Sequence, residues 1–116
     1  MAQSFRKSLS FEDRFAKASG LIKKYPGYIP IICEKNQDSN GADLEKKKYM
    51  VPGEITLGQF LTIVRKRIKL EQSQAIFIFV NGHIISSHEI ISSVYQAHKD
   101  HDNFLYMTYS KENTFG

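Results

Sequence analysis

Apolar residues recur at spacings of four and three near the start of the chain, and this period predicts an amphipathic helix. Ser10 is a suitable N-cap with Asp13 three residues later, and Pro26 ends the pattern. At about 100° per residue, Leu21 falls roughly 80° from the centre of the apolar stripe, so it is expected to be apolar without being core. The stripe consists of Phe11, Phe15, Ala18, Ile22 and Tyr25.

The next segment predicts a hairpin and a second helix. Residues 29–34 are rich in β-branched side chains and predict a strand. After a polar loop over 36–45, residues 48–51 predict a second strand that Pro52 and Gly53 end. Along the second strand, alternation sends neighbouring side chains to opposite faces. Thr56 and Gln59 form a capping box at the start of the helix. Its apolar stripe comprises Leu57, Phe60, Leu61, Val64 and Ile68.

The last third of the chain predicts two strands and a short helix. The apolar run over 75–80 is typical of a strand covered on both faces, and Asn81 with Gly82 favours a tight turn before 83–85. A short helix is expected near 90–95 and a final strand over 104–109.

This order of elements, with a small sheet around one long helix, predicts a β-grasp layout of the α+β class. We expect a mixed four-stranded sheet with an N-terminal helical extension. The chain then forms a single domain over residues 1–116. Its parts are the extension at 1–25, the core at 28–110 and a polar tail at 111–116.

Composition narrows the picture only slightly. The 116 residues are 41% hydrophobic and 24% charged, as in one globular domain. A single cysteine, Cys33, allows no intramolecular disulfide and is expected to be buried and inert within an apolar strand. No apolar stretch is long enough to span a bilayer, so the chain is expected to be soluble and cytosolic. The net charge of +4 permits anionic membranes, acidic peptides or nucleic acid as partners, without selecting one.

The sequence resembles the autophagy ubiquitin-like modifiers, the GABARAP-type family, from about Phe11 to Gly116. The final Gly116 lacks a Cβ, so its carboxylate can pass through a narrow channel. The resemblance rests on several stretches in one order: 23–26, 29–35, 46–49, 51–52, 58–60, 65–67, 77–81 and 104–106.

This resemblance implies a protein that is a substrate and a scaffold and is not an enzyme. Gly116 would be passed between activating and conjugating enzymes, joined to phosphatidylethanolamine, and released by a delipidating cysteine protease. The resemblance also implies a cytoplasmic protein that joins the autophagosome membrane when lipidated, and reaches the vacuole or lysosome lumen after fusion. No cofactor and no metal are expected.

The same resemblance implies a groove with two pockets for receptor peptides carrying an aromatic-x-x-aliphatic motif. The first pocket, for the aromatic residue, would comprise Lys17, Leu21, Pro30, Ile32, Lys48, Met50 and Phe104. The second, for the aliphatic residue, would comprise Tyr49, Val51, Pro52, Ile55, Phe60, Ile63 and Arg67. We interpret Phe60, Ile63 and Arg67 as lying on one margin of the helix stripe, and Tyr49 as marginal too. The chain departs from the family at Tyr28, where an arginine is common, and at Lys17, where an acidic residue is frequent.

Other constellations favour simpler interpretations. His98 and His101, with Asp100 and Asp102, are spaced like metal ligands, but a satisfied or solvated surface turn is the preferred interpretation because no third ligand has convincing spacing. The basic run over 65–69 lacks interleaved aromatic residues for base stacking, so nucleic acid is not expected as a partner.

Three classes of function stay open on the sequence. The first is a lipid-conjugated modifier that docks receptors, the second is a modifier conjugated to proteins, and the third is an unconjugated basic adaptor for peptides or the cytoskeleton. The two pockets and the helical extension favour the first class over the second. The terminal glycine disfavours the third.

Overall fold

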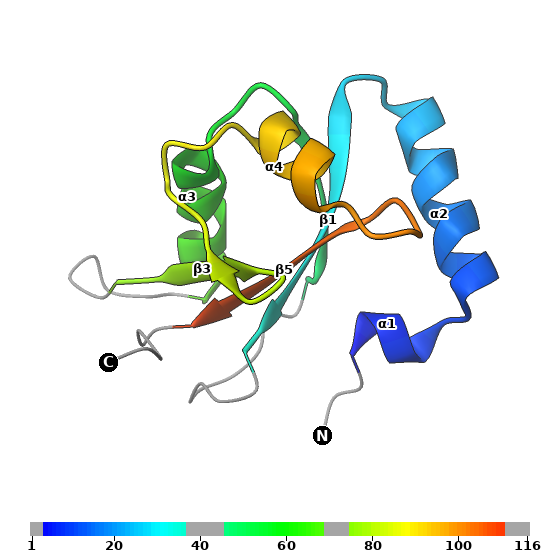
Figure 1. Ribbon diagram of the computed structural model, residues 1–116, viewed down its shortest axis with the longest axis horizontal. Helices are drawn as coiled ribbons and strands as arrows, with labels where there is room; N and C mark the ends of the chain where they lie inside the picture. The colour runs from blue at the N-terminus through cyan, green and yellow to red at the C-terminus, as the bar shows by residue number, and fades with distance from the viewer. Residues whose placement is uncertain (1–3, 37–45, 69–74, 111–116) are drawn as a thin grey trace.

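The computed structural model describes residues 4–36, 46–68 and 75–110, and shows helices packed around a twisted sheet (Figure 1). The predicted tail over 111–116 and most of the predicted loop over 36–45 lie outside the described residues. The elements in chain order are α1 (Phe5–Ser8), α2 (Phe11–Lys24), β1 (Tyr28–Lys35), β2 (Lys48–Pro52), α3 (Leu57–Ile68), β3 (Phe77–Val80), β4 (His83–Ile84), α4 (Ile91–His98) and β5 (Leu105–Ser110).

The sheet is mixed, as predicted, but it has five strands in the order β2-β1-β5-β3-β4. β1 pairs antiparallel with β2 and parallel with β5, and β3 pairs antiparallel with both β5 and β4. The expected four strands become five because the Asn81–Gly82 turn brings His83 and Ile84 back against β3. Both turn residues have positive φ, 52° at Asn81 and 81° at Gly82, as a tight hairpin turn requires.

The two faces of the sheet carry separate apolar clusters. Figure 1 shows α3 and α4 on one side of the sheet and α1 and α2 on the other. Along β1, Ile31 and Cys33 face the larger cluster under α3 and α4, while Ile32 between them faces the extension. Cys33 is fully buried, as predicted. We call the smaller group the α2-side cluster: Ala18, Ile32 and Phe104, with Phe5, Leu21 and Tyr106 packed against it.

The predicted apolar stripe of α2 is only partly correct. Ser10 caps the helix as expected, because its hydroxyl accepts the Asp13 N–H at 3.1 Å. Phe11 and Phe15, however, are 44% and 43% exposed and stack on each other, with ring centroids 6.1 Å apart. Ala18 is the helix's one buried residue within the described range, and Leu21 packs beside it. The side of α2 that packs on the sheet therefore includes Ala18 and Leu21 and leaves Phe11 and Phe15 exposed.

The predicted capping box of α3 is confirmed. The Thr56 N–H donates to Gln59 Oε1 at 2.9 Å, and the Gln59 N–H donates to Thr56 Oγ1 at 3.2 Å. These reciprocal bonds satisfy two backbone donors at the start of the helix. Leu57, Phe60 and Val64 are the buried residues of α3, which places their stripe on the larger cluster.

Candidate functional site

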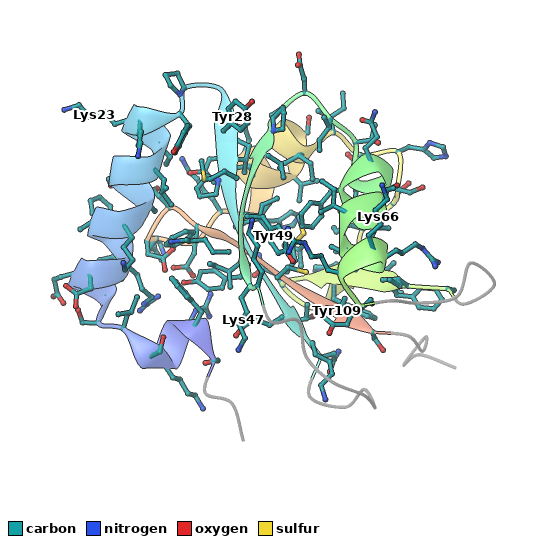
Figure 2. All side chains as sticks on the ribbon, turned by 180° about the vertical axis from the view of Figure 1, so that it is seen from behind. Lys23, Tyr28, Lys47, Tyr49, Lys66 and Tyr109 are labelled. Carbon is teal, nitrogen blue, oxygen red and sulfur yellow. The ribbon has the colours of Figure 1, made fainter. Side chains whose placement is uncertain are left out.

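β2 is an edge of the sheet and lies between α2 and α3. Figure 2 shows this strand in front, with α2 on one side and α3 on the other. Its burial alternates as predicted: Tyr49 and Val51 are buried in the larger cluster, whereas Lys48 is exposed and Met50 is partly exposed. The strand thus presents an edge that borders both faces of the sheet.

The residues predicted for the first pocket gather on the α2 side of β2. Pro30 pairs with Met50 and Ile32 with Lys48 in the β1–β2 register, and Leu21 and Phe104 belong to the α2-side cluster. Ile32 and Phe104 are fully buried. Lys17 and Lys48 are exposed, so the group has an apolar floor and cationic borders.

The residues predicted for the second pocket gather on the α3 side, but three of them belong to the core. Tyr49 is 4% exposed and Phe60 0% exposed, with their rings 5.5 Å apart in an edge-on arrangement. Val51 is buried in the same cluster. The interpretation of Tyr49 and Phe60 as marginal is therefore wrong, because their side chains fill the space between the sheet and α3. Ile63 and Arg67 are exposed, and Pro52 and Ile55 are partly exposed.

Three consecutive lysines precede or begin β2, and their side chains differ in environment. Lys47 Nζ lies 3.3 Å from Glu34 Oε2, in a pair that is largely shielded from water. Lys46 Nζ lies 5.3 Å from the centre of the Tyr49 ring, and Lys48 is exposed. Cationic groups at Lys46 and Lys48 therefore border the free edge, while the Lys47 charge is offset by Glu34.

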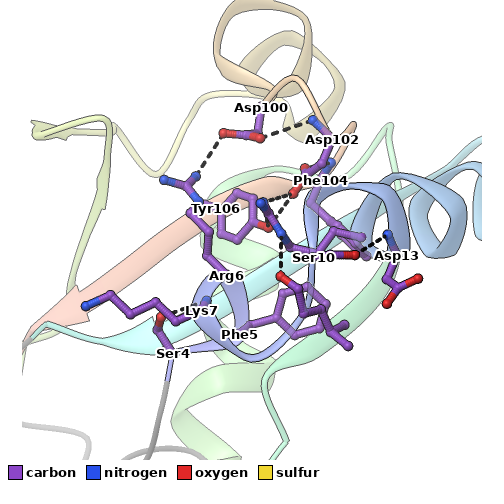
Figure 3. A network of polar contacts seen from close by, with 12 residues as sticks. Ser4, Phe5, Arg6, Lys7, Ser10, Asp13, Asp100, Asp102, Phe104 and Tyr106 are labelled. Carbon is purple, nitrogen blue, oxygen red and sulfur yellow. Dashed lines mark hydrogen bonds and ion pairs between the residues drawn. The ribbon is translucent and has the colours of Figure 1, made fainter.

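A polar network that the sequence analysis did not predict joins the extension to the end of the sheet (Figure 3). Asp102 is completely buried, and its carboxylate accepts from Arg14 Nη1 at 2.7 Å, from the Tyr106 hydroxyl at 2.5 Å and from the Phe104 N–H at 2.8 Å. Burial, followed by the hydrogen bond to Asp102, raises the pKa of Tyr106 to about 12. The hydrogen bond with Tyr106 is the main cause that raises the pKa of Arg14.

This network corrects part of the interpretation of residues 98–102. Asp102 is buried and does not lie on the surface. Its carboxylate does have hydrogen-bond partners, as the prediction of a satisfied turn requires. Within the described ranges, no group of three histidine, cysteine, aspartate or glutamate side chains could hold a metal ion. One signal in the sequence could have revealed the network. Arg14 lies one turn before Ala18 on α2, and a cation on the side of a helix that packs on the sheet requires a buried partner.

The tail residue Gly116 cannot be placed relative to the groove, since it lies outside the described residues. β5 runs to Ser110, whose position in the sheet is opposite Phe77 of β3. No helix in the described part of the chain is long and apolar enough to cross a bilayer.

The mixed sheet around α3, with a helical extension on its other face, defines a ubiquitin-like protein of the β-grasp class. The family model described as "Autophagy protein Atg8 ubiquitin like" matches residues 13–116, and the chain belongs to this family. It is 47% identical over 116 residues to autophagy-related protein 8 of Kluyveromyces lactis, covering 100% of this chain and 94% of the relative. Its identity to the same protein of Aspergillus niger is 49%, with 100% and 98% covered.

The fold is also similar to a solved relative. The crystal structure of Trypanosoma brucei ATG8 superposes with a TM-score of 0.90 at 36% identity, over 95% of each chain. The ubiquitin-like fold and the link to autophagy that the sequence implied are thus confirmed.

Proposed function

We propose that this protein is a modifier whose Gly116 carboxylate is joined to the amino group of phosphatidylethanolamine, and that it then acts in autophagosome formation. The match to the family extends to residue 116, which supports Gly116 as the conjugated residue. Activation to a thioester on family enzymes precedes an amide bond to the lipid nitrogen, with the enzyme thiol as leaving group. The chain is the substrate of this transfer and of the cysteine protease that reverses it.

The free edge of β2 is the observation that best supports receptor docking as the second half of this function. An extended peptide adds to such an edge through backbone hydrogen bonds, and its successive side chains alternate between the two faces of the sheet. Residues three apart in the peptide therefore point to opposite faces. An aromatic-x-x-aliphatic motif would place its aromatic residue toward Leu21 on the α2 side and its aliphatic residue toward Ile63 on the α3 side.

The charges along this edge favour partners with acidic residues beside the aromatic anchor. Lys17 and Lys48 are exposed, and each exposed pair would contribute about 0.2 to 1 kcal/mol and weaken with salt. Tyr28, at the far end of the groove, is 43% exposed and offers a ring where relatives commonly carry a guanidinium. Acids that depend on an arginine at position 28 should therefore matter less here than acids that reach Lys17, Lys46 or Lys48.

Substitution of the terminal residue tests the conjugation step. Gly116→Ala should greatly reduce lipid coupling in a reaction with purified family enzymes and vesicles containing phosphatidylethanolamine, because the added Cβ obstructs passage of the carboxylate. The fold should be unchanged by circular dichroism. Asn113→Ala serves as a matched control in the same tail and should couple like the wild type.

The outcome also separates the alternatives. Undiminished coupling of the Gly116→Ala variant would overturn conjugation through this residue. Mass spectrometry of cellular adducts distinguishes a lipid adduct from a protein adduct or an unconjugated basic adaptor.

A further inference from the structure

The floor of the first pocket is covered in the free protein. Ile32 and Phe104 are both 0% exposed. The Phe5 ring of α1 lies edge-on against Phe104, with centroids 5.2 Å apart and ring planes at 77°. The centroids of the Phe5 and Tyr106 rings lie 6.5 Å apart. A partner's aromatic side chain can therefore reach this floor only when a covering group moves.

The covering groups differ in how firmly they are held. α2 has 14 residues, a buried Ala18 and the Arg14–Asp102 pair, in which the side chains are only 12% and 0% exposed. Displacing α2 would leave the buried Asp102 carboxylate without its cation, which is costly. α2 is therefore expected to stay in place when a ligand binds.

α1 is held more weakly. It has four residues, and none of them is buried. Its contacts with the sheet include the pair of Arg6 Nη2 and Asp100 Oδ1 at 2.9 Å, whose side chains are 51% and 26% exposed. The Arg6 guanidinium also lies 4.1 Å from the Tyr106 ring centre, and the Phe5 N–H donates to Glu34 Oε2 at 2.9 Å. Exposed pairs of this kind contribute little to stability. Of the two helices that pack on this cluster, α1 can therefore leave at a smaller cost than α2.

We propose that Phe5 is an intramolecular occupant of the first pocket, and that an incoming aromatic anchor displaces it together with α1. This inference rests on the docking function proposed above. The position of Phe5 supports it, because the α2-side cluster already accommodates an aromatic ring against Phe104. The apparent affinity for a peptide is then reduced by the fraction of molecules in which Phe5 covers the floor.

Calorimetric titration of the full chain with an aromatic-x-x-aliphatic peptide tests the proposal. Phe5→Ala should bind about threefold to thirtyfold more tightly than the wild type, since it removes the competing ring. Arg6→Gln keeps the ring but removes the tie to Asp100, so it should shift affinity in the same direction by less. Phe11→Ala removes an exposed phenylalanine that lies outside the cluster, and it should bind like the wild type.

Nuclear magnetic resonance gives a second, structural result. When peptide is added to the 15N-labelled wild type, the Phe5 amide should lose the shift caused by its bond to Glu34 and move toward the value of an unstructured residue. In the Arg6→Gln variant, the Phe5 amide should reach the same chemical shift at a lower peptide concentration. A Phe5 amide that keeps its free-state position at saturating peptide would overturn the proposal.

The titrations also separate this inference from the docking function. If the wild type binds and Phe5→Ala binds equally or more weakly, Phe5 is not a competitor but docking stands. If only the Phe5→Ala variant binds, the ring is confirmed as an occupant, and docking in the wild type requires release of α1. If neither binds, both proposals fail.

Discussion

At the scale of single residues, Asp102 shows how a buried charge joins two parts of this fold. Its carboxylate accepts from Arg14 of α2, from Tyr106 of β5 and from the Phe104 backbone. A buried ion pair is weak evidence for stability in itself, but removal of one partner leaves an uncompensated charge. The network therefore fixes where the extension rests on the sheet.

Neutralising this carboxylate should destabilise the protein. Asp102→Asn is expected to lower the free energy of unfolding by about 2 to 4 kcal/mol, because Arg14 keeps its charge without a counter-ion. Urea unfolding measures the change. Glu54→Gln, at an exposed loop position, is the control and should stay within about 0.5 kcal/mol of the wild type. A loss for Asp102→Asn no larger than that of the control would contradict this role.

The raised pKa of Tyr106 predicts a pH dependence at high pH. Its folded pKa of about 12 exceeds that of an unfolded tyrosine, about 10, so the folded state favours the protonated phenol. The contribution is complete below about pH 10 and is lost as the pH rises through about 12. Urea unfolding between these values should show a shallower decline for Tyr106→Phe than for the wild type. A decline for Tyr106→Phe as steep as that of the wild type would contradict this prediction.

At the scale of elements, local patterns predicted most of the structure and tertiary contacts explain the errors. The capping box of α3 and the alternation of β2 depend on near neighbours in sequence, and both are confirmed. The face that α2 turns to the sheet depends on a tertiary contact, because Arg14 pairs with Asp102, which is 88 residues later in the sequence. The prediction for Tyr49 is wrong because its ring packs on Phe60 of α3, a contact between two elements that the pattern along β2 does not reveal.

The burial of Tyr49 changes how the groove should be tested. Tyr49→Ala should lower the free energy of unfolding by about 3 kcal/mol, because it removes a ring packed on Phe60 in the core. Ile63→Ala, at 38% exposure, should cost less than about 1 kcal/mol of stability yet weaken peptide binding by roughly 1 to 2 kcal/mol. Urea unfolding and calorimetry of both variants measure the two effects. Equal losses of stability would place Ile63 in the core and remove it from the groove.

At the scale of the whole molecule, β2 is the strand edge at which both apolar layers of the sheet meet solvent. The sheet separates the larger cluster under α3 and α4 from the α2-side cluster, and β2 borders both. The opposite edge of the sheet is β4, which has two residues and offers a shorter edge for a peptide than β2 does. Beside β4, a cavity of about 350 Å³ is lined by residues that include Ile84, Val94 and His98. The residues of the β2 edge could be predicted from the resemblance, whereas the covering of its first pocket by Phe5 required the packed structure.

Mapping the bound peptide on the 15N-labelled protein tests the central claim, docking at the β2 edge, most directly. With an aromatic-x-x-aliphatic peptide, the largest amide shifts should fall along residues 48–51, with further changes at Leu21 on one side and Ile63 on the other. A peptide with alanine at both anchors should cause no comparable shifts. Changes centred on β4 and α4 with β2 unaffected would contradict the account, because they would place the peptide at the opposite edge of the sheet.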